Sequence, residues 1–144
     1  MVSHYIANPL TIDGLKFDLR IYVAITSINP LRIYIYEEGL VRFATQLYQP
    51  PLIDSEADPY VHLTNYSINK HNNKSLIAGH EMAEEADGIK WSFKAWKQVL
   101  KAHQVNDEKL FSKIKDIVVK TIISCEPNLN SAFEMYVPHR SNCF

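Results

Sequence analysis

A stretch of strict apolar–polar alternation near the N-terminus constrains the fold of this chain most. The stretch is LKFDLRIYVAIT, residues 15–26. Successive side chains of a β-strand point to opposite faces, so this alternation predicts a strand with one apolar face and one polar face. The apolar row consists of Phe17, Leu19, Ile21, Val23 and Ile25. The polar row begins with Lys16, Asp18 and Arg20, so two cations and a carboxylate line one face of the predicted strand.

Further strands follow the first one at short intervals, and residues 4–48 as a whole predict an antiparallel meander. The later strands are LRIYIYEE (31–38) and LVRFAT (40–45), and the turns are Asp13-Gly14, SINP (27–30) and EEG (37–39). Short turns between successive strands favour antiparallel pairing, and the β-branched and aromatic residues suit a half-buried sheet. Arg42, on the last of these strands, is then expected near Arg20 across the sheet.

The second half of the chain predicts two helices. Ser92 is the predicted N-cap of the first, and the second begins near Asn106 or Asp107, runs to about Cys125 and is expected to end at Pro127. Apolar residues at helical spacing are Phe93, Trp96, Val99, Leu100 and His103 in the first helix and Leu110, Phe111, Ile114, Ile117, Val118, Thr121, Ile122 and Cys125 in the second. Both stripes are expected to face the core.

Residues 49–91 predict a long, partly ordered loop region, because they contain several prolines and an Asn-rich segment. Loops of this length inside a domain are often functional. The expected fold class is therefore α+β, an antiparallel sheet with packed helices.

Bulk composition excludes several classes of function. Fifteen Lys and Arg against sixteen Asp and Glu give no support for nucleic-acid binding by overall charge. The N-terminus has no signal-peptide pattern, and no apolar run is long enough for a membrane span, so no membrane partner is expected. The two cysteines are expected to be reduced thiols. The six histidines include no ligand-like pairing, so no metal ligand is expected, and no Walker-type glycine loop occurs.

The charged face of the first strand has two interpretations from the residues alone. Lys16, Arg20 and Arg42 offer a point charge and two forked donors suited to phosphate, with Asp18 either holding the cations or accepting from a sugar hydroxyl. The alternative without a binding role is a solvated sheet face with weak surface ion pairs. Thr64 and Asn65 similarly either form a turn or donate neutral hydrogen bonds to a polar ligand.

Four segments of the chain resemble the tubulin tyrosine ligase-like family, and its polyglutamylase members most closely. The segments are KFDLRIYV, PLRIYIYEEGLVRFAT, HLTNYSINKHN and YVPHRSNCF. The resemblance implies that residues 1–144 form part of an ATP-grasp catalytic domain, cut at both ends. It also implies a reaction: ATP activates a glutamate side chain of a tubulin tail as an acylphosphate, and the amine of free glutamate then attacks it.

The resemblance also assigns roles to individual residues. His4, Tyr5 and Ile6 match the hinge against which the adenine ring lies, and Lys16 and Asp18 match positions facing the nucleotide. Arg20 and Arg42 match catalytic positions near the terminal phosphate and the substrate carboxylate. Thr64 and Asn65 match the loop that completes the substrate pocket.

The resemblance implies further properties beyond these residues. The cofactors would be ATP and magnesium, whose family ligands follow the NCF segment, so the 144-residue chain alone is expected to be inactive. The setting would be the cytoplasm and the microtubule cytoskeleton, with cilium or basal body as further sites. The alternative function is a catalytically silent remnant that binds nucleotide or a tubulin tail.

Overall fold

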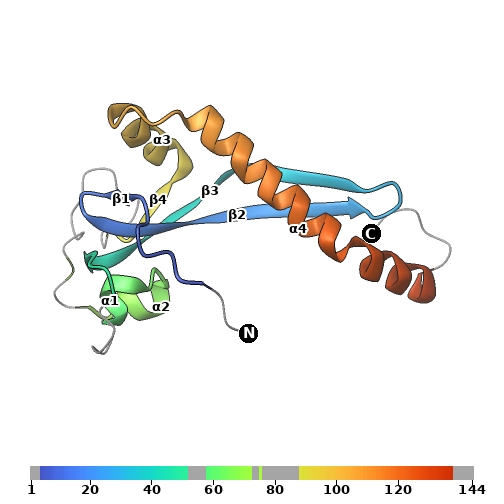
Figure 1. Cartoon of the computed structure of the whole chain (residues 1–144), viewed down its shortest axis with the longest axis horizontal. Coiled ribbons are helices and arrows are strands. Elements are labelled where there is room, and N and C mark those ends of the chain that lie inside the picture. The colour runs from blue at the N-terminus through green and yellow to red at the C-terminus, as the bar shows by residue number, and fades with distance from the viewer. Residues whose placement is uncertain (1–3, 52–57, 73–74, 76–87, 138–144) are drawn as a thin grey trace. The chain divides into compact units, whose positions relative to one another are not determined.

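The chain was analysed as a computed structural model that describes residues 4–51, 58–72, 75 and 88–137. Four strands form one sheet in the order β1-β2-β3-β4, in agreement with the predicted α+β class (Figure 1). The strands are β1 (Thr11–Ile12), β2 (Leu15–Ser27), β3 (Arg32–Leu47) and β4 (Lys90–Ser92). The helices are α1 (Pro59–His62), α2 (Tyr66–Asn69), α3 (Phe93–Ala102) and α4 (Asp107–Tyr136).

Contacts divide the chain into two compact units, and each is described by itself. Unit 1 comprises Met1–Arg20 and Gly39–Trp96, and unit 2 comprises Ile21–Glu38 and Lys97–Phe144. Among the helices described in either unit, none is long and apolar enough to cross a bilayer.

The two predicted turns beside the first long strand are confirmed. Ile12 pairs with Leu15 across the Asp13-Gly14 turn, and both turn residues have positive φ angles, 51° and 77°. Two-residue hairpin loops of this kind need positive φ at both central positions, which Asp tolerates and Gly adopts without strain. The second turn follows Ser27 and connects β2 to β3.

The turn predicted at 37–39 is wrong, because β3 continues through Glu37, Glu38 and Gly39 as one strand of 16 residues. Gly39 is buried, and a Cβ atom added there would collide with the backbone oxygen of Arg20 and lie 2.6 Å from Cζ of Phe93. The glycine therefore permits a close approach of backbone and aromatic ring within a strand, which is the second common use of glycine in sheets.

Aromatic side chains dominate the core of unit 1. Phe43 and Trp91 have ring centroids 4.5 Å apart, and Phe17 lies 5.8 Å from Phe43 and 6.0 Å from Trp96. These rings join β2, β3, β4 and the first turn of α3, and Trp96 and Phe93 of α3 are fully buried as predicted. Phe17 and Leu19 of the predicted apolar row of β2 are half-buried, but so are Lys16 and Asp18 of the polar row. Val23 of the apolar row is 38% exposed, so burial separates the two rows less than predicted.

The segment between β3 and α3 contains more regular structure than predicted. Two single-turn helices, α1 and α2, and the strand β4 lie where the sequence predicted a loop. Asp58 caps α1 by accepting a 2.8 Å hydrogen bond from the Tyr60 N–H, and Pro59 occupies its first turn, both favourable starts for a helix. Ser92 caps α3 as predicted, since its Oγ accepts from the Ala95 N–H.

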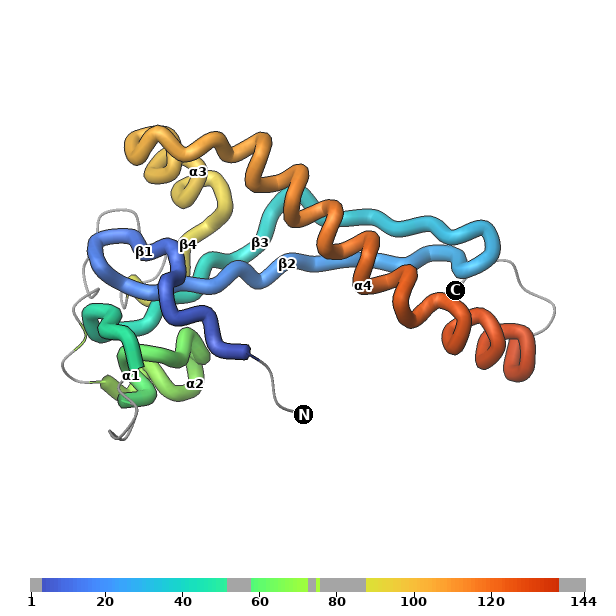
Figure 2. Tube along the Cα trace, in the orientation of Figure 1, coloured from blue at the N-terminus to red at the C-terminus, as the bar shows by residue number. Residues whose placement is uncertain are grey.

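In unit 2, α4 continues past its predicted end. Asn106 caps its start by accepting from the Lys109 N–H at 2.8 Å, but the helix passes through Pro127 and ends at Tyr136 (Figure 2). Proline removes the hydrogen bond to the carbonyl of residue 123. Ile123 is 55% exposed, so water reaches this turn and can take over the freed carbonyl.

The apolar stripe of α4 is covered less than predicted. None of its described residues is buried, and Ile117 is 62% exposed. Leu110, Phe111 and Ile114 are half-buried and belong to the helix turns that border a groove against residues 35–37 of β3. The expectation of core packing therefore holds for α3 and is wrong for α4.

Candidate functional site

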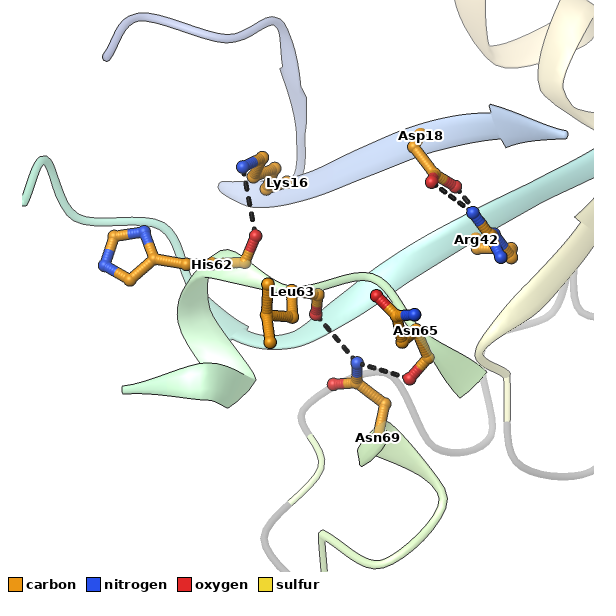
Figure 3. A network of polar contacts seen from close by, with 7 residues as sticks. All are labelled: Lys16, Asp18, Arg42, His62, Leu63, Asn65 and Asn69. Carbon is orange, nitrogen blue, oxygen red and sulfur yellow. Dashed lines mark hydrogen bonds and ion pairs between the residues drawn. The ribbon is translucent and has the colours of Figure 1, made fainter. Parts of the chain in front are cut away.

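The centre of the candidate site is an ion pair between neighbouring strands of unit 1 (Figure 3). Arg42 of β3 donates from Nε to Oδ1 of Asp18 of β2 at 2.8 Å, and from Nη2 to Oδ2 of the same carboxylate. The Arg42 side chain is 20% exposed and that of Asp18 is 38% exposed. This two-pronged geometry fixes the plane of the guanidinium, which a Lys–carboxylate pair cannot do.

Asp18 therefore holds a cation in place, which is one of the two roles that its position on the strand left open. The structure joins Arg42 to Asp18, whereas the sequence placed Arg42 beside Arg20. Arg20 is exposed, and its guanidinium makes no hydrogen bond or ion pair with the other described residues.

Lys16 lies in a second polar cluster, at the start of β2. Its Nζ donates to the carbonyl oxygen of His62 at 3.0 Å and to the Tyr5 hydroxyl at 3.2 Å, and it lies 4.7 Å from the centroid of the Tyr5 ring. The Tyr5 hydroxyl is also 2.9 Å from Nδ1 of His62. The ammonium thus ties the N-terminal segment to α1 through β2.

Tyr48 completes this cluster on the side of the N-terminal segment. Its hydroxyl donates to the Ala7 carbonyl at 2.8 Å, and its ring meets the His62 ring edge-on at 5.8 Å. Desolvation raises the pKa of Tyr48 above its ordinary value, neighbouring Tyr5 raises it further, and Lys16 opposes the shift. The hydroxyl is therefore a proton donor throughout the neutral pH range.

The loop between α1 and α2 presents Thr64 and Asn65. Thr64 is 7% exposed, and Asn65 is exposed. Asn65 occupies the N-cap position of α2, yet its side chain makes no capping hydrogen bond. An N-cap asparagine usually satisfies a helix N–H, so this amide is not committed to the local fold.

Residues 4–6 form an irregular segment in which Tyr5 and Ile6 are 40% and 70% exposed. Within the described part of the chain, their backbone groups make no hydrogen bond. Exposed, unpaired backbone groups are what a purine edge needs for recognition.

Sequence reasoning missed three residues that organise this region, namely His62, Tyr48 and Asn69. His62 is the first residue of the HLTN segment, next to the predicted Thr64–Asn65 loop, and this position could have indicated its role. Tyr48 gave no local signal, because its partner Ala7 lies 41 positions away. Asn69 has two partners within six positions, but its partner Thr45 on β3 lies 24 positions away.

The described donors fit a polyphosphate better than they fit a metal ion. Lys16 donates to two neutral oxygens, and a bond from its ammonium to an anionic phosphate oxygen is stronger than a bond to a neutral oxygen. No group of three or more His, Cys, Asp or Glu that could hold a metal ion occurs among the described residues. Cys125 is an exposed free thiol, and Cys143 lies outside the described residues.

The whole sequence, residues 1–144, matches the model of the "Tubulin-tyrosine ligase family". The chain belongs to the tubulin-tyrosine ligase family. The predicted resemblance is thereby confirmed for every segment that suggested it, including the C-terminal one, most of which lies outside the described structure.

Curated relatives in this family are tubulin glutamylases. The chain is 47% identical over 143 residues to tubulin monoglutamylase TTLL4 of Homo sapiens, covering 99% of this chain and 12% of that protein. It is 44% identical to human tubulin polyglutamylase TTLL5, over 100% of this chain and 11% of that protein. Identity to human tubulin polyglutamylase TTLL6 is 42%, over 97% of this chain and 15% of that protein. The chain thus spans a small part of each relative's length.

Proposed function

We propose that this chain forms the nucleotide- and acceptor-binding part of an ATP-dependent ligase that adds glutamate to tubulin tails. The observation that carries the proposal is the Asp18–Arg42 pair beside Lys16 and the Thr64–Asn65 loop, in a chain 42–47% identical to tubulin glutamylases along nearly its whole length. The reaction would take place in the microtubule cytoskeleton, with cilium or basal body as further sites.

The reaction has two balanced steps. A carboxylate oxygen of the acceptor glutamate attacks the terminal phosphorus of ATP, the bond to ADP breaks, and an acylphosphate forms. The amine of free glutamate then attacks the acyl carbon, inorganic phosphate leaves with the electron pair, and the amine loses a proton. Negative charge on the phosphoryl oxygens is spread in the first transition state, and fixed cations stabilise it.

Each residue of the site has a role in this scheme. Lys16 would bind a phosphate of ATP, while the hinge at 4–6 would receive the adenine. Arg42, held by Asp18, would face the transferred phosphoryl group without reorganising. Arg20 is exposed and would meet the carboxylate of the acceptor. Thr64 and Asn65 would donate hydrogen bonds to the same substrate.

The proposal is tested with the intact protein whose reading frame contains these 144 residues. Purified protein, ATP, magnesium, labelled glutamate and tubulin should give label in the tubulin tails. Asp18→Asn keeps the size of the side chain but removes the charge that holds Arg42, and should lower turnover at least about 10-fold. Arg32→Ala, an exposed arginine on β3, is the matched control and should leave turnover unchanged.

A second measurement addresses the nucleotide site separately. The chain should bind ATP, and Lys16→Ala should weaken binding about 10-fold or more, the cost of a charge-assisted contact, while exposed Lys94→Ala should not. If neither the wild type nor the Arg32→Ala control incorporates label, the proposed ligase activity is rejected. Binding of ATP or a tail peptide without turnover would favour the non-catalytic alternative.

A further inference from the structure

A fully buried asparagine, Asn69 at the end of α2, lies behind the Thr64–Asn65 loop. Its Nδ2 donates to the carbonyl oxygens of Leu63 at 2.8 Å and of Asn65 at 3.1 Å (Figure 3). We propose that Asn69 is a positioning residue that fixes the backbone on both sides of Thr64 and so aims Thr64 and Asn65 at the acceptor substrate. This inference rests on the proposed function and names a residue beyond it.

The amide of Asn69 is fully used. Besides its two donor bonds, its Oδ1 accepts from the Thr45 hydroxyl at 2.7 Å, and that hydroxyl accepts from Nδ2 of Asn72 at 2.8 Å. Thr45 lies on β3, and like Asn69 its relative exposure is 0%. This series of hydrogen bonds therefore anchors the Thr64–Asn65 loop to strand β3 through Asn69.

Such an arrangement is costly if it serves packing alone. Burying an amide gains nothing over an apolar side chain of similar size unless every polar atom is paired. Here the paired atoms are carbonyl oxygens of an exposed loop, which water could satisfy instead. The hydrogen bonds from Asn69 thus replace water on these carbonyl oxygens and favour a single conformation of the loop.

The loop conformation that Asn69 selects leaves one side chain available. The backbone oxygen of Asn65 accepts from Nδ2 of Asn69 and from the N–H groups of Ile68 and Asn69, at 3.1 Å and 3.0 Å for the two backbone bonds. The Asn65 side chain makes no capping bond. Asn69 therefore holds the backbone of a residue whose side chain remains free to bind substrate.

The first arm of the test uses this chain and does not depend on catalysis. Asn69→Asp keeps the shape and the acceptor toward Thr45 but replaces both donors to the loop with a carboxylate oxygen. Amide exchange across residues 63–69 should become at least about 10-fold faster, while exchange at Trp91 in β4 stays as in the wild type. Thr45→Val, which leaves the loop donors intact, should accelerate exchange in 63–69 less than Asn69→Asp. Unchanged exchange in Asn69→Asp overturns the inference.

The second arm uses the intact ligase. Asn69→Asp should raise KM for the tubulin acceptor about 10-fold and leave KM for ATP within about 2-fold, because Thr64 and Asn65 are placed at the acceptor. The effect should vanish in an Asn65→Ala background, since residues acting as a unit are non-additive. Thr45→Val should lower the melting temperature without changing KM. Equal KM effects in Asn69→Asp and Thr45→Val, or additivity with Asn65→Ala, overturn the inference.

Two controls separate the remaining outcomes. If Asn69→Asp does not fold, Asn69→Ser, whose shorter side chain cannot reach the Leu63 and Asn65 carbonyls, should raise KM for the acceptor about 10-fold, whereas an unchanged KM overturns the inference. If the wild-type ligase adds no glutamate, the proposed function fails, and the exchange measurement alone decides whether Asn69 holds the loop.

Discussion

Replacement of Arg42 and of Arg20 by alanine should affect turnover alike and stability differently. Arg42 is only 20% exposed and bonds both oxygens of Asp18, whereas Arg20 is exposed and bonds no other described side chain. Both arginines are proposed to face charge that develops during transfer, and loss of such an electrostatic donor lowers kcat about 10²-fold or more, so both variants of the intact ligase should be slow.

The difference in stability follows from what each substitution leaves behind. Arg42→Ala leaves a partly exposed carboxylate without its two charge-assisted bonds, at a cost of about 1–2 kcal/mol after discounting for solvent. That cost lowers the melting temperature by about 2–8 °C for a domain of this size. Arg20→Ala removes a solvated charge and should change stability by less than about 0.5 kcal/mol.

The assay pairs kcat for glutamate transfer with melting temperatures for both variants and for Arg42→Lys. The lysine variant should recover part of the stability but little of the turnover, because an ammonium lacks the planar fork. A double-mutant cycle of Arg42→Ala with Asp18→Ala should give a coupling energy of about 1 kcal/mol. Near-normal turnover in a folded Arg20→Ala or Arg42→Ala protein would refute the catalytic assignment, and equal melting temperatures would refute the stability argument.

Three further predictions concern single residues. Gly39→Ala should destabilise unit 1 by about 1–3 kcal/mol in urea unfolding, because the new methyl group would lie 2.6 Å from Phe93; an unchanged midpoint would contradict this. Asn106→Ala should lower the free energy of unfolding by about 1 kcal/mol and reduce the helical circular dichroism signal, since the Lys109 N–H loses its acceptor. Asn106→Asp keeps an acceptor oxygen and should retain both the stability and the helical signal. Because the pKa of Tyr48 is raised, its protonated hydroxyl contributes stability that is complete below about pH 10 and is lost as the pH rises through the folded-state pKa. An alkaline titration followed by absorbance at 295 nm should show one tyrosine that ionises later than the others, and Tyr48→Phe should lack this late step.

Local periodicity was sufficient to predict the charged face of β2 and the hairpin at Asp13-Gly14. Alternation and positive-φ turn residues act over a few positions, so neighbouring sequence determines them. The sequence placed Arg42 on the strand after residues 31–38 and near Arg20, and it did not predict the two-pronged bond to Asp18. That bond forms because residues 32–47 are one continuous strand beside β2, which brings Arg42 to Asp18.

The failures share a physical cause, which is that distant partners override local preference. In the sequence, Gly39 is typical of a turn. In the structure, the ring of Phe93 occupies the space that a side chain at position 39 would need. Pro127 resembles a helix end, yet the carbonyl that it frees lies at an exposed turn and the helix continues. The helix α2 is one turn long, and its last residue, Asn69, bonds Thr45, 24 positions earlier, a contact that no local pattern indicates.

The same contacts that stabilise unit 1 also prepare it for the proposed chemistry. Arg42 is oriented by Asp18, Lys16 by Tyr5 and His62, and the 63–65 backbone by Asn69, each through side chains of the fold itself. A cation oriented before substrate arrives loses little conformational freedom on binding and need not reorganise in the transition state. The orienting partners of Lys16 are neutral oxygens, which a phosphate would replace in the proposed complex, whereas Arg42 has a carboxylate partner. In the proposed reaction, Lys16 would therefore bind and release the nucleotide, and Arg42 would stabilise the transferred group throughout.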